Sequence, residues 1–208
     1  MRKSLVGSAL AAFAAFALMI GVGGAMADSS TNWQLANGNV QVSDTGPAAF
    51  NFSVPTKARL LYDGKDASLL GAGLTKTMTA TFTVAADTGT FTYGGQPSCG
   101  GSTGNVRLYF ESIPKGAKFA YTNYWWADVA SATLANGTAS LTEIVNHAQP
   151  WSDWNGQPSL ANQAAFDAAA SNITAVGLSF GGGCFFENGV GTTDGRGSFT
   201  LNSFTVLP

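Results

Sequence analysis

The sequence predicts an all-β domain built as a two-sheet sandwich with one short helix. Short stretches of alternating polar and apolar residues are separated by Gly, Asn and Asp turns, which is the pattern of antiparallel sheets with one buried face. Only 11% of the residues are charged, whereas 12% are aromatic and 26 are glycine, a composition typical of secreted β proteins. The loops between the strands differ greatly in length, which favours a sandwich over an up-and-down barrel.

The first 27 residues have the pattern of a cleaved secretion signal. A basic start at residues 2–3, an apolar run over residues 5–22 and an Ala-Met-Ala sequence ending at residue 27 follow one another, as such signals require. An uncleaved membrane anchor is the alternative, but the run is rich in Ala and Gly and leads directly into the cleavage pattern. We therefore expect residues 28–208 to form one soluble domain, extracellular or periplasmic.

The charge of the mature chain argues against two classes of partner. Without the basic start, eight Lys and Arg residues stand against 12 Asp and Glu residues, a net charge of about −4. Nucleic acids and anionic membrane surfaces are bound through basic patches. We expect neither as a partner after the signal is removed.

The clearest predicted strand runs from Thr77 to Val84. Four apolar residues alternate in it with four threonines, so that one face packs and the other meets water. The same period of two occurs at residues 50–54, 106–110 and 175–180. The Asn136-Gly137 pair suits a tight hairpin between such strands.

One segment breaks the strand pattern, from Ser159 to Ser171. It is rich in alanine, and Ala165, Phe166, Ala169, Ala170 and Ile173 share one helical face. Ser159 follows a proline and is predicted to cap the N-terminus. The segment predicts a single helix of about three turns that covers one end or edge of a sheet.

The last strand, residues 198–206, changes face part of the way along. Phe199 and Leu201 point one way, whereas Phe204 and Val206 point the other way. A bulge or twist near Asn202 is the expected cause.

This closing strand and the order of the preceding segments resemble the galactose-binding-like jelly rolls of many carbohydrate-binding modules. Those chains commonly end in an aromatic-x-Leu-Asp strand with alternating hydrophobic residues, and Phe199-Thr-Leu-Asn202 is similar to it. The strand from Thr77, a middle block of Trp followed by Asn-Gly-Thr, and a late Val-Gly-Leu strand follow in the same order over residues 40–206. The resemblance implies a two-sheet jelly-roll sandwich and carbohydrate binding.

The resemblance also bears on cofactors. Asn202 stands where those modules often have Asp, which argues against the structural calcium ion that some of them carry. We expect no cofactor. A calcium ion held by backbone carbonyls of the loop from Glu187 to Asp194 is the alternative.

Four of the five tryptophans lie in one stretch, from Phe119 to Trp154. Exposed Trp and Tyr rings bind sugars because pyranose C–H groups pack on the ring face while amides and carboxylates bond to the hydroxyls. Adjacent Trp125 and Trp126 must point to opposite faces of a strand, so at least one belongs to the core. Trp151 and Trp154 lie in a polar loop bounded by proline and are the predicted platform. The predicted ligand-binding residues are Tyr124, Trp126, Trp151, Asp153, Trp154 and Asn155.

Cys99 and Cys184 are the only cysteines, and each lies in a glycine-rich loop. In an exported chain a disulfide between them is expected. Closing a loop of this length stabilises the fold by roughly 4–5 kcal/mol in the chain-entropy model.

Three functions compete. The leading hypothesis is a secreted, non-catalytic module that binds polysaccharide through the aromatic platform. The second is a structural or adhesive protein whose aromatic residues only pack, which predicts that both loop tryptophans are buried. The third is a small glycan-cleaving enzyme, which needs two carboxylates facing each other across a cleft.

The acidic residues and the single histidine favour binding over catalysis without excluding an enzyme. Only three glutamates follow the signal, and nothing in the sequence brings Glu111 and Glu187 together. Both are predicted to be solvated surface acids. His147 is predicted in a surface loop, with neither a catalytic triad nor a metal site around it.

Overall fold

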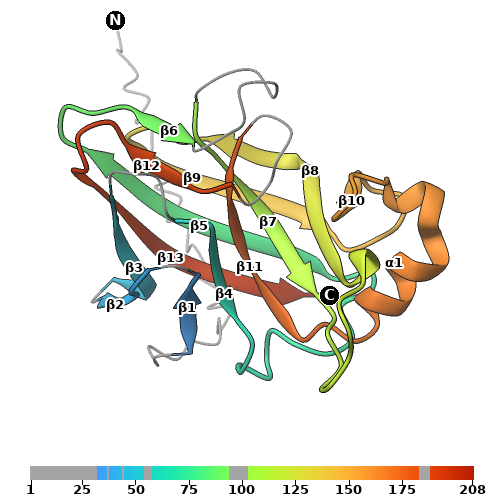
Figure 1. Cartoon of the computed structure of the whole chain (residues 1–208). Coiled ribbons are helices and arrows are strands. Elements are labelled where there is room, and N and C mark those ends of the chain that lie inside the picture. The colour runs from blue at the N-terminus through green and yellow to red at the C-terminus, as the bar shows by residue number, and fades with distance from the viewer. Residues whose placement is uncertain (1–31, 37, 44, 54–57, 94–102, 183–187) are drawn as a thin grey trace, which may run out of the picture.

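Two antiparallel sheets packed face to face form the body of the protein, and a small third sheet lies beside them (Figure 1). The computed structural model describes residues 32–36, 38–43, 45–53, 58–93, 103–182 and 188–208. The predicted secretion signal and both cysteines of the predicted disulfide lie outside these residues. None of the helices in the described ranges is long and apolar enough to cross a membrane.

The six-stranded sheet has the order β1-β4-β11-β7-β8-β10, and the five-stranded sheet has the order β2-β3-β13-β5-β9. The strands of the six-stranded sheet are β1 (Trp33–Leu35), β4 (Leu60–Asp63), β7 (Asn105–Glu111), β8 (Tyr124–Thr133), β10 (Trp151–Asp153) and β11 (Ala175–Gly181). Those of the five-stranded sheet are β2 (Gln41–Ser43), β3 (Gly46–Phe52), β5 (Thr77–Ala86), β9 (Gly137–Ile144) and β13 (Gly197–Leu207). The third sheet pairs β6 (Phe91–Tyr93) with β12 (Val190–Thr192).

The strand order is that of a jelly roll. The eight principal strands in chain order are β3, β4, β5, β7, β8, β9, β11 and β13. The first pairs with the eighth, the second with the seventh, the third with the sixth and the fourth with the fifth, always antiparallel. This nested pairing is that of a long hairpin wrapped into two sheets, so the predicted two-sheet jelly-roll sandwich is confirmed.

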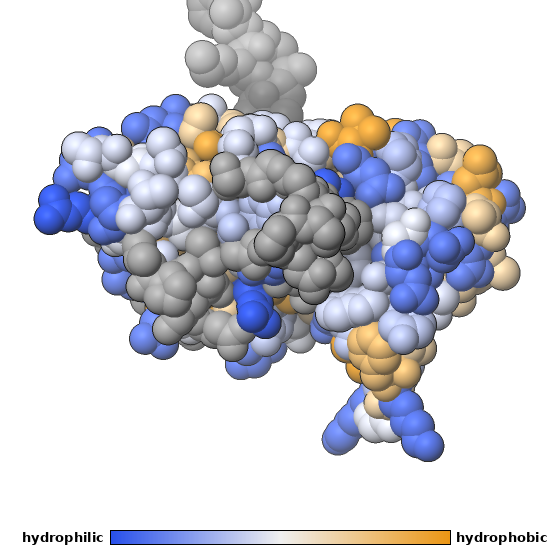
Figure 2. Space-filling view, turned by 45° about the horizontal axis from the view of Figure 1, so that its top comes forward, coloured by the Kyte–Doolittle hydropathy of each residue, from blue (hydrophilic) through white to orange (hydrophobic). Residues whose placement is uncertain are grey.

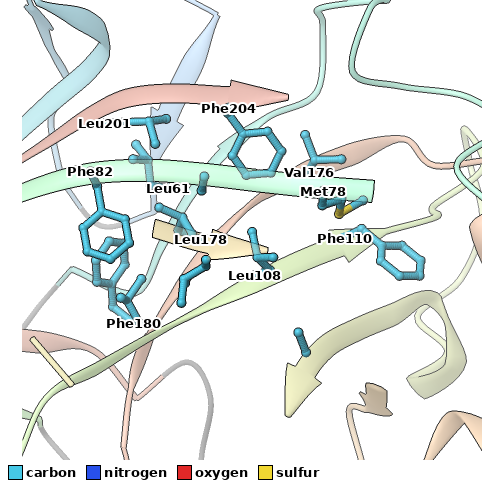
Figure 3. Close-up of a cluster of buried hydrophobic side chains, with 14 of the residues drawn as sticks. Leu61, Met78, Phe82, Leu108, Phe110, Val176, Leu178, Phe180, Leu201 and Phe204 are labelled. Atoms are coloured by element: carbon cyan, nitrogen blue, oxygen red, sulfur yellow. The ribbon is translucent and has the colours of Figure 1, made fainter. Parts of the chain in front are cut away.

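The core lies between the two sheets. In β5 the apolar residues are buried and the threonines are half-exposed, as predicted. The outward threonines hydrogen-bond to hydroxyls of β9, at 3.2 Å for Thr79–Thr142 and 2.9 Å for Thr83–Thr138. Figure 3 shows buried residues of both sheets meeting in the interior, among them Phe82 and Leu108.

The closing strand has the irregularity that its sequence predicts. The register of β13 against β5 shifts between Leu201 and Ser203. Phe199 and Leu201 before the shift and Phe204 and Val206 after it are therefore all buried, although their spacing changes phase. The Asn202 amide between them donates to the Thr83 hydroxyl at 2.9 Å.

The predicted helix lies at one end of the sandwich (Figure 1), but it is shorter than expected. A 3-10 turn, η3 (Ser159–Asn162), leads into α1 (Gln163–Ala170). Phe166 of α1 packs on Trp125 and on Phe110 of the core, with ring centroids 4.9 and 5.6 Å apart. Ser159 makes no side-chain cap, because its hydroxyl donates to the carbonyls of His147 and Gln149 instead.

The prediction of a tight hairpin at Asn136-Gly137 is wrong. These residues lead from β8 in one sheet to β9 in the other, with Gly137 at φ +124°. The Asn136 side chain bonds to both the amide and the carbonyl of Ala86. The pair therefore makes a crossover between the sheets and not a turn within one sheet.

Candidate functional site

The outer face of the six-stranded sheet has a small hydrophobic cluster of its own, apart from the main core. Leu60, Tyr109 and Trp126 are buried there, on β4, β7 and β8, with β11 between β4 and β7. Trp126 lies directly opposite Tyr109, with ring centroids 5.2 Å apart. Trp125 points the other way, into the core, so the prediction that these neighbours face opposite sides is confirmed.

Above this cluster four aromatic residues meet at the surface, and we call them the aromatic patch: Phe119, Tyr121, Tyr124 and Trp154. Phe119 is 57% exposed, Tyr121 is 49% exposed and Trp154 is 44% exposed. The Phe119 ring lies 5.2–5.5 Å from each of the other three. Such a group of exposed rings in mutual contact is unusual for a surface that only meets water.

Three elements position the patch. Tyr121 belongs to the 3-10 turn η2 (Tyr121–Asn123), which leads directly into Tyr124 at the start of β8. Trp154 follows the edge strand β10, and its amide bonds to the Tyr121 carbonyl at 3.4 Å. The buried Trp126 lies beneath, 5.6 Å from Trp154 and stacked 6.4 Å from Tyr124. Because Tyr124 and Trp154 rest on a buried ring and Phe119 contacts both of them, the patch is preorganised.

The structure corrects the predicted role of Asp153. Its side chain is buried, and one carboxylate oxygen accepts the backbone N–H groups of Asn155 and Gln157, each at 2.9 Å. Gly156 takes the positive φ of +73° that this turn requires. Asp153 therefore shapes the turn that presents Trp154, while the side chains of Asn155 and Gln157 are exposed beside it.

Trp151 was predicted as half of the platform, and the structure contradicts its exposure. The ring is fully buried against Phe110, and its Nε1 donates to the Ile144 carbonyl at 2.9 Å. Trp151 is the first residue of β10 and pairs with Ala127, so its side chain points into the core. A ring in this position cannot stack on a ligand at the surface. Of the two loop tryptophans only Trp154 is exposed.

Charged groups on this outer face are engaged by protein partners. Arg107 pairs with Asp128 at 3.7 Å, and the Ser152 hydroxyl donates to the same Asp128 oxygen at 2.7 Å. Burial raises the pKa of Asp128, against the opposing effects of these two partners. Glu111 accepts a short hydrogen bond from the Tyr109 hydroxyl. Glu111 is half-buried, so the prediction of a solvated surface acid is wrong for it, whereas Glu187 lies outside the described residues.

We predict a pH-dependent contribution of Glu111 to stability. Burial raises its pKa above the ordinary value, although the Tyr109 hydrogen bond works in the opposite direction. The folded state then holds the proton more tightly than the unfolded state. The stabilisation that protonated Glu111 gives the folded state is fully present below the unfolded-state pKa, about 4.3. It is lost as the pH rises through the folded-state pKa. Urea unfolding between acid and neutral pH should show Glu111→Gln gaining relative stability as the pH rises. A pH-independent difference would contradict this.

His147 has a structural role. Its Nδ1 lies 2.8 Å from the Asp167 carboxylate and ties its loop to α1. Within the described ranges no group of three His, Cys, Asp or Glu residues could hold a metal ion. The predicted alternative calcium loop begins outside those ranges. Its last residue, Asp194, accepts hydrogen bonds from the Arg196 amide and the Thr88 hydroxyl, which lower the pKa of Asp194 to about 2.

Sequence reasoning missed Phe119 and Tyr121, which supply the two most exposed rings of the patch. Both precede β8 at an irregular spacing, so no strand pattern assigns them a face. Their position directly after the Pro-Lys-Gly-Ala-Lys turn, which cannot be buried, was the one available signal.

Two surface hollows lie away from the patch. One has a volume of about 460 Å³ and is lined by parts of β3, β5 and β13, including Asn51, and by Arg196 in the turn before β13. The other has a volume of about 490 Å³ and lies beside β6 and the crossover at Asn136. Among the described residues that line them, Phe91 is the only aromatic one, and it is buried. The patch is therefore the better candidate for recognising a ligand with flat apolar faces.

Comparisons with known proteins give one structural similarity. No family model matches the sequence, and no curated protein is similar to it. Among solved structures the fold is similar to a chain described as a xylan-binding module CBM15, with a TM-score of 0.41 and 11% identity over 84% of this chain and 93% of that chain.

Proposed function

We propose that this protein is an exported, non-catalytic carbohydrate-binding protein and that the aromatic patch holds its polysaccharide ligand. The observation that carries the proposal is the contact of four partly exposed aromatic rings around Phe119, at the edge of the six-stranded sheet. A sugar ring presents apolar C–H groups on its face and hydroxyls at its rim. A ring surface flanked by amides matches both features.

The polar residues beside the patch can form hydrogen bonds with the hydroxyls of a bound sugar. Asn155 and Gln157 are exposed in the turn that carries Trp154, and Asn123 is half-exposed next to Tyr124. Their amides can donate to and accept from sugar hydroxyls. Stacking contributes the affinity, and these amides select the orientation of the bound sugar.

The competing functions have less support. A protein whose aromatic residues only pack predicts that Trp151 and Trp154 are both buried, and Trp154 is not. A glycan-cleaving enzyme needs two carboxylates facing a substrate. Near the patch the Asp153 carboxylate is buried and bonded to the backbone, and Glu111 is bonded to Tyr109. These contacts favour binding as the function.

Replacing two patch rings tests the proposal. We expect the Phe119→Ala, Trp154→Ala double variant to bind polysaccharide about 10- to 100-fold more weakly, because it loses two stacking surfaces. The measurement is affinity electrophoresis over a panel of soluble neutral and acidic polysaccharides, followed by isothermal titration with the best ligand. The unfolding midpoint should change little, since both rings are at the surface.

The matched control removes two other exposed hydrophobic side chains. Val129 and Leu207 are at least as exposed as the patch residues and lie outside the patch. A Val129→Ala, Leu207→Ala variant should bind as the parent protein does. Unchanged binding in the patch variant, or no binding to any polysaccharide by the parent protein, would refute the proposal.

A further inference from the structure

A projecting loop ends at the aromatic patch. Residues 112–120 connect β7 to η2, and in Figure 1 they form the yellow-green loop that extends beyond the sheets. The loop turns at Pro114–Ala117, where the Ala117 amide bonds to the Pro114 carbonyl at 2.9 Å and Gly116 has φ +80°. Its base is fixed by the Ser112 amide bonding to the Asn123 carbonyl at 2.8 Å. The loop therefore has a defined direction relative to the patch.

Two lysines are exposed on this projection, Lys115 and Lys118. Figure 2 shows the projection at the lower right, with a hydrophilic tip and a hydrophobic base. Lys118 precedes Phe119 of the patch directly. Lys115 is four residues from Phe119, which places the two Cα atoms at most about 14 Å apart. Both ammonium groups are therefore within reach of a ligand on the patch.

Neither lysine forms an ion pair with a residue of the described ranges. The two ion pairs among the described residues are Arg107–Asp128 and His147–Asp167. No acidic residue occurs between positions 112 and 127, although the whole chain carries more acidic than basic residues. Two described carboxylates near the patch have other partners, since Glu111 bonds to Tyr109 and Asp153 bonds to the backbone of its own turn. No described residue therefore pairs with the positive charge beside the patch, which is available for a ligand.

We infer that the ligand of the aromatic patch is an acidic polysaccharide whose uronate carboxylates pair with Lys115 and Lys118. This inference rests on the proposed carbohydrate binding and adds the chemical class of the sugar. In a polyuronate every ring carries both a C–H face and a carboxylate. A ring stacked on Phe119 thus presents its carboxylate beside Lys118, and a neighbouring ring along the chain reaches Lys115. A neutral glycan would use the rings and leave both charges unpaired.

The test compares polymers that differ in charge but not in sugar rings. The probes are polygalacturonate and alginate, each with its esterified, uncharged counterpart, measured by isothermal titration at low and at moderate salt. We expect tighter binding of a charged polymer, weakened by salt as exposed ion pairs are. Lys115→Gln with Lys118→Gln should weaken that binding about 3- to 20-fold, from two exposed pairs, and should not alter binding of the esterified polymer. A Lys65→Gln, Arg196→Gln variant removes the same charge elsewhere on the surface and should bind as the parent protein does.

Each outcome separates this inference from the function it rests on. Equal binding of charged and esterified polymers, or binding of neutral glycans alone, overturns the acidic ligand and leaves carbohydrate binding intact. Equal losses in the lysine variant and its charge control show a general electrostatic effect and also overturn the site. If no polysaccharide binds, both the proposed function and this inference fail. Binding to vesicles of anionic lipid without binding to any polysaccharide would point to a membrane surface and would overturn both.

Discussion

Replacing Trp151 by alanine should destabilise the fold by about 3–5 kcal/mol, the cost of emptying a buried Trp position. The ring is fully buried against Phe110 and lies 6.1 Å from the Phe166 ring of α1. Its loss opens a cavity where the helix closes the sandwich and leaves the Ile144 carbonyl without its indole donor. Urea unfolding measures the change, with a constant m-value showing that the loss is one of stability.

Two further variants serve as controls for Trp151→Ala. Trp154→Ala should cost less than about 1 kcal/mol because the ring is at the surface, and it should weaken ligand binding. Trp151→Phe keeps most of the volume and should recover most of the stability, except for the lost hydrogen bond at about 1–3 kcal/mol. If Trp151→Ala proved as stable as Trp154→Ala, the ring would not be part of the core.

The fold could be predicted because its signals are local and repeat. The threonine alternation of β5 and the phase change in β13 each follow from the period of two in an extended chain, and both are confirmed. The alanines located the helix, but they did not predict that its first turn is a 3-10 turn over Ser159–Asn162. Ser159 was assigned from its place after a proline, while its hydroxyl bonds to a loop that the sequence does not place nearby.

The site was harder to predict because burial is decided by elements far apart in the chain. Trp151 and Trp154 lie three residues apart in the same polar segment, and only the pairing of β10 with β8 directs the first inward. The turn after it then directs the second outward. That Trp125 and Trp126 face opposite sides of the sheet was predictable, because adjacent side chains of a strand point to opposite faces. The gathering of Phe119 with Trp154 required the tertiary structure.

Replacing Asp153 by alanine should reduce stability and ligand binding together. The carboxylate is buried and accepts the amides of Asn155 and Gln157, and hydrogen bonds to a charged group contribute about 1.5–3 kcal/mol each. The turn is partly exposed, so water recovers some of this, and we expect a net loss of about 2–3 kcal/mol. Trp154 lies inside the turn, so a loosened turn would also cost affinity, because the ring must then be ordered on binding.

The pattern of losses distinguishes this positioning role from the direct ligand contact that the sequence predicted. A contact residue changes affinity and leaves the unfolding midpoint unaltered. A positioning residue changes both, and Asp153→Asn should restore much of each because an amide oxygen can still accept from the two backbone donors. Asn155→Ala is the contrasting variant: its side chain is exposed beside Trp154, so it should weaken binding at nearly unchanged stability. If Asp153→Ala kept full stability but lost binding, the Asp153 carboxylate would be a direct ligand contact and not a positioning residue.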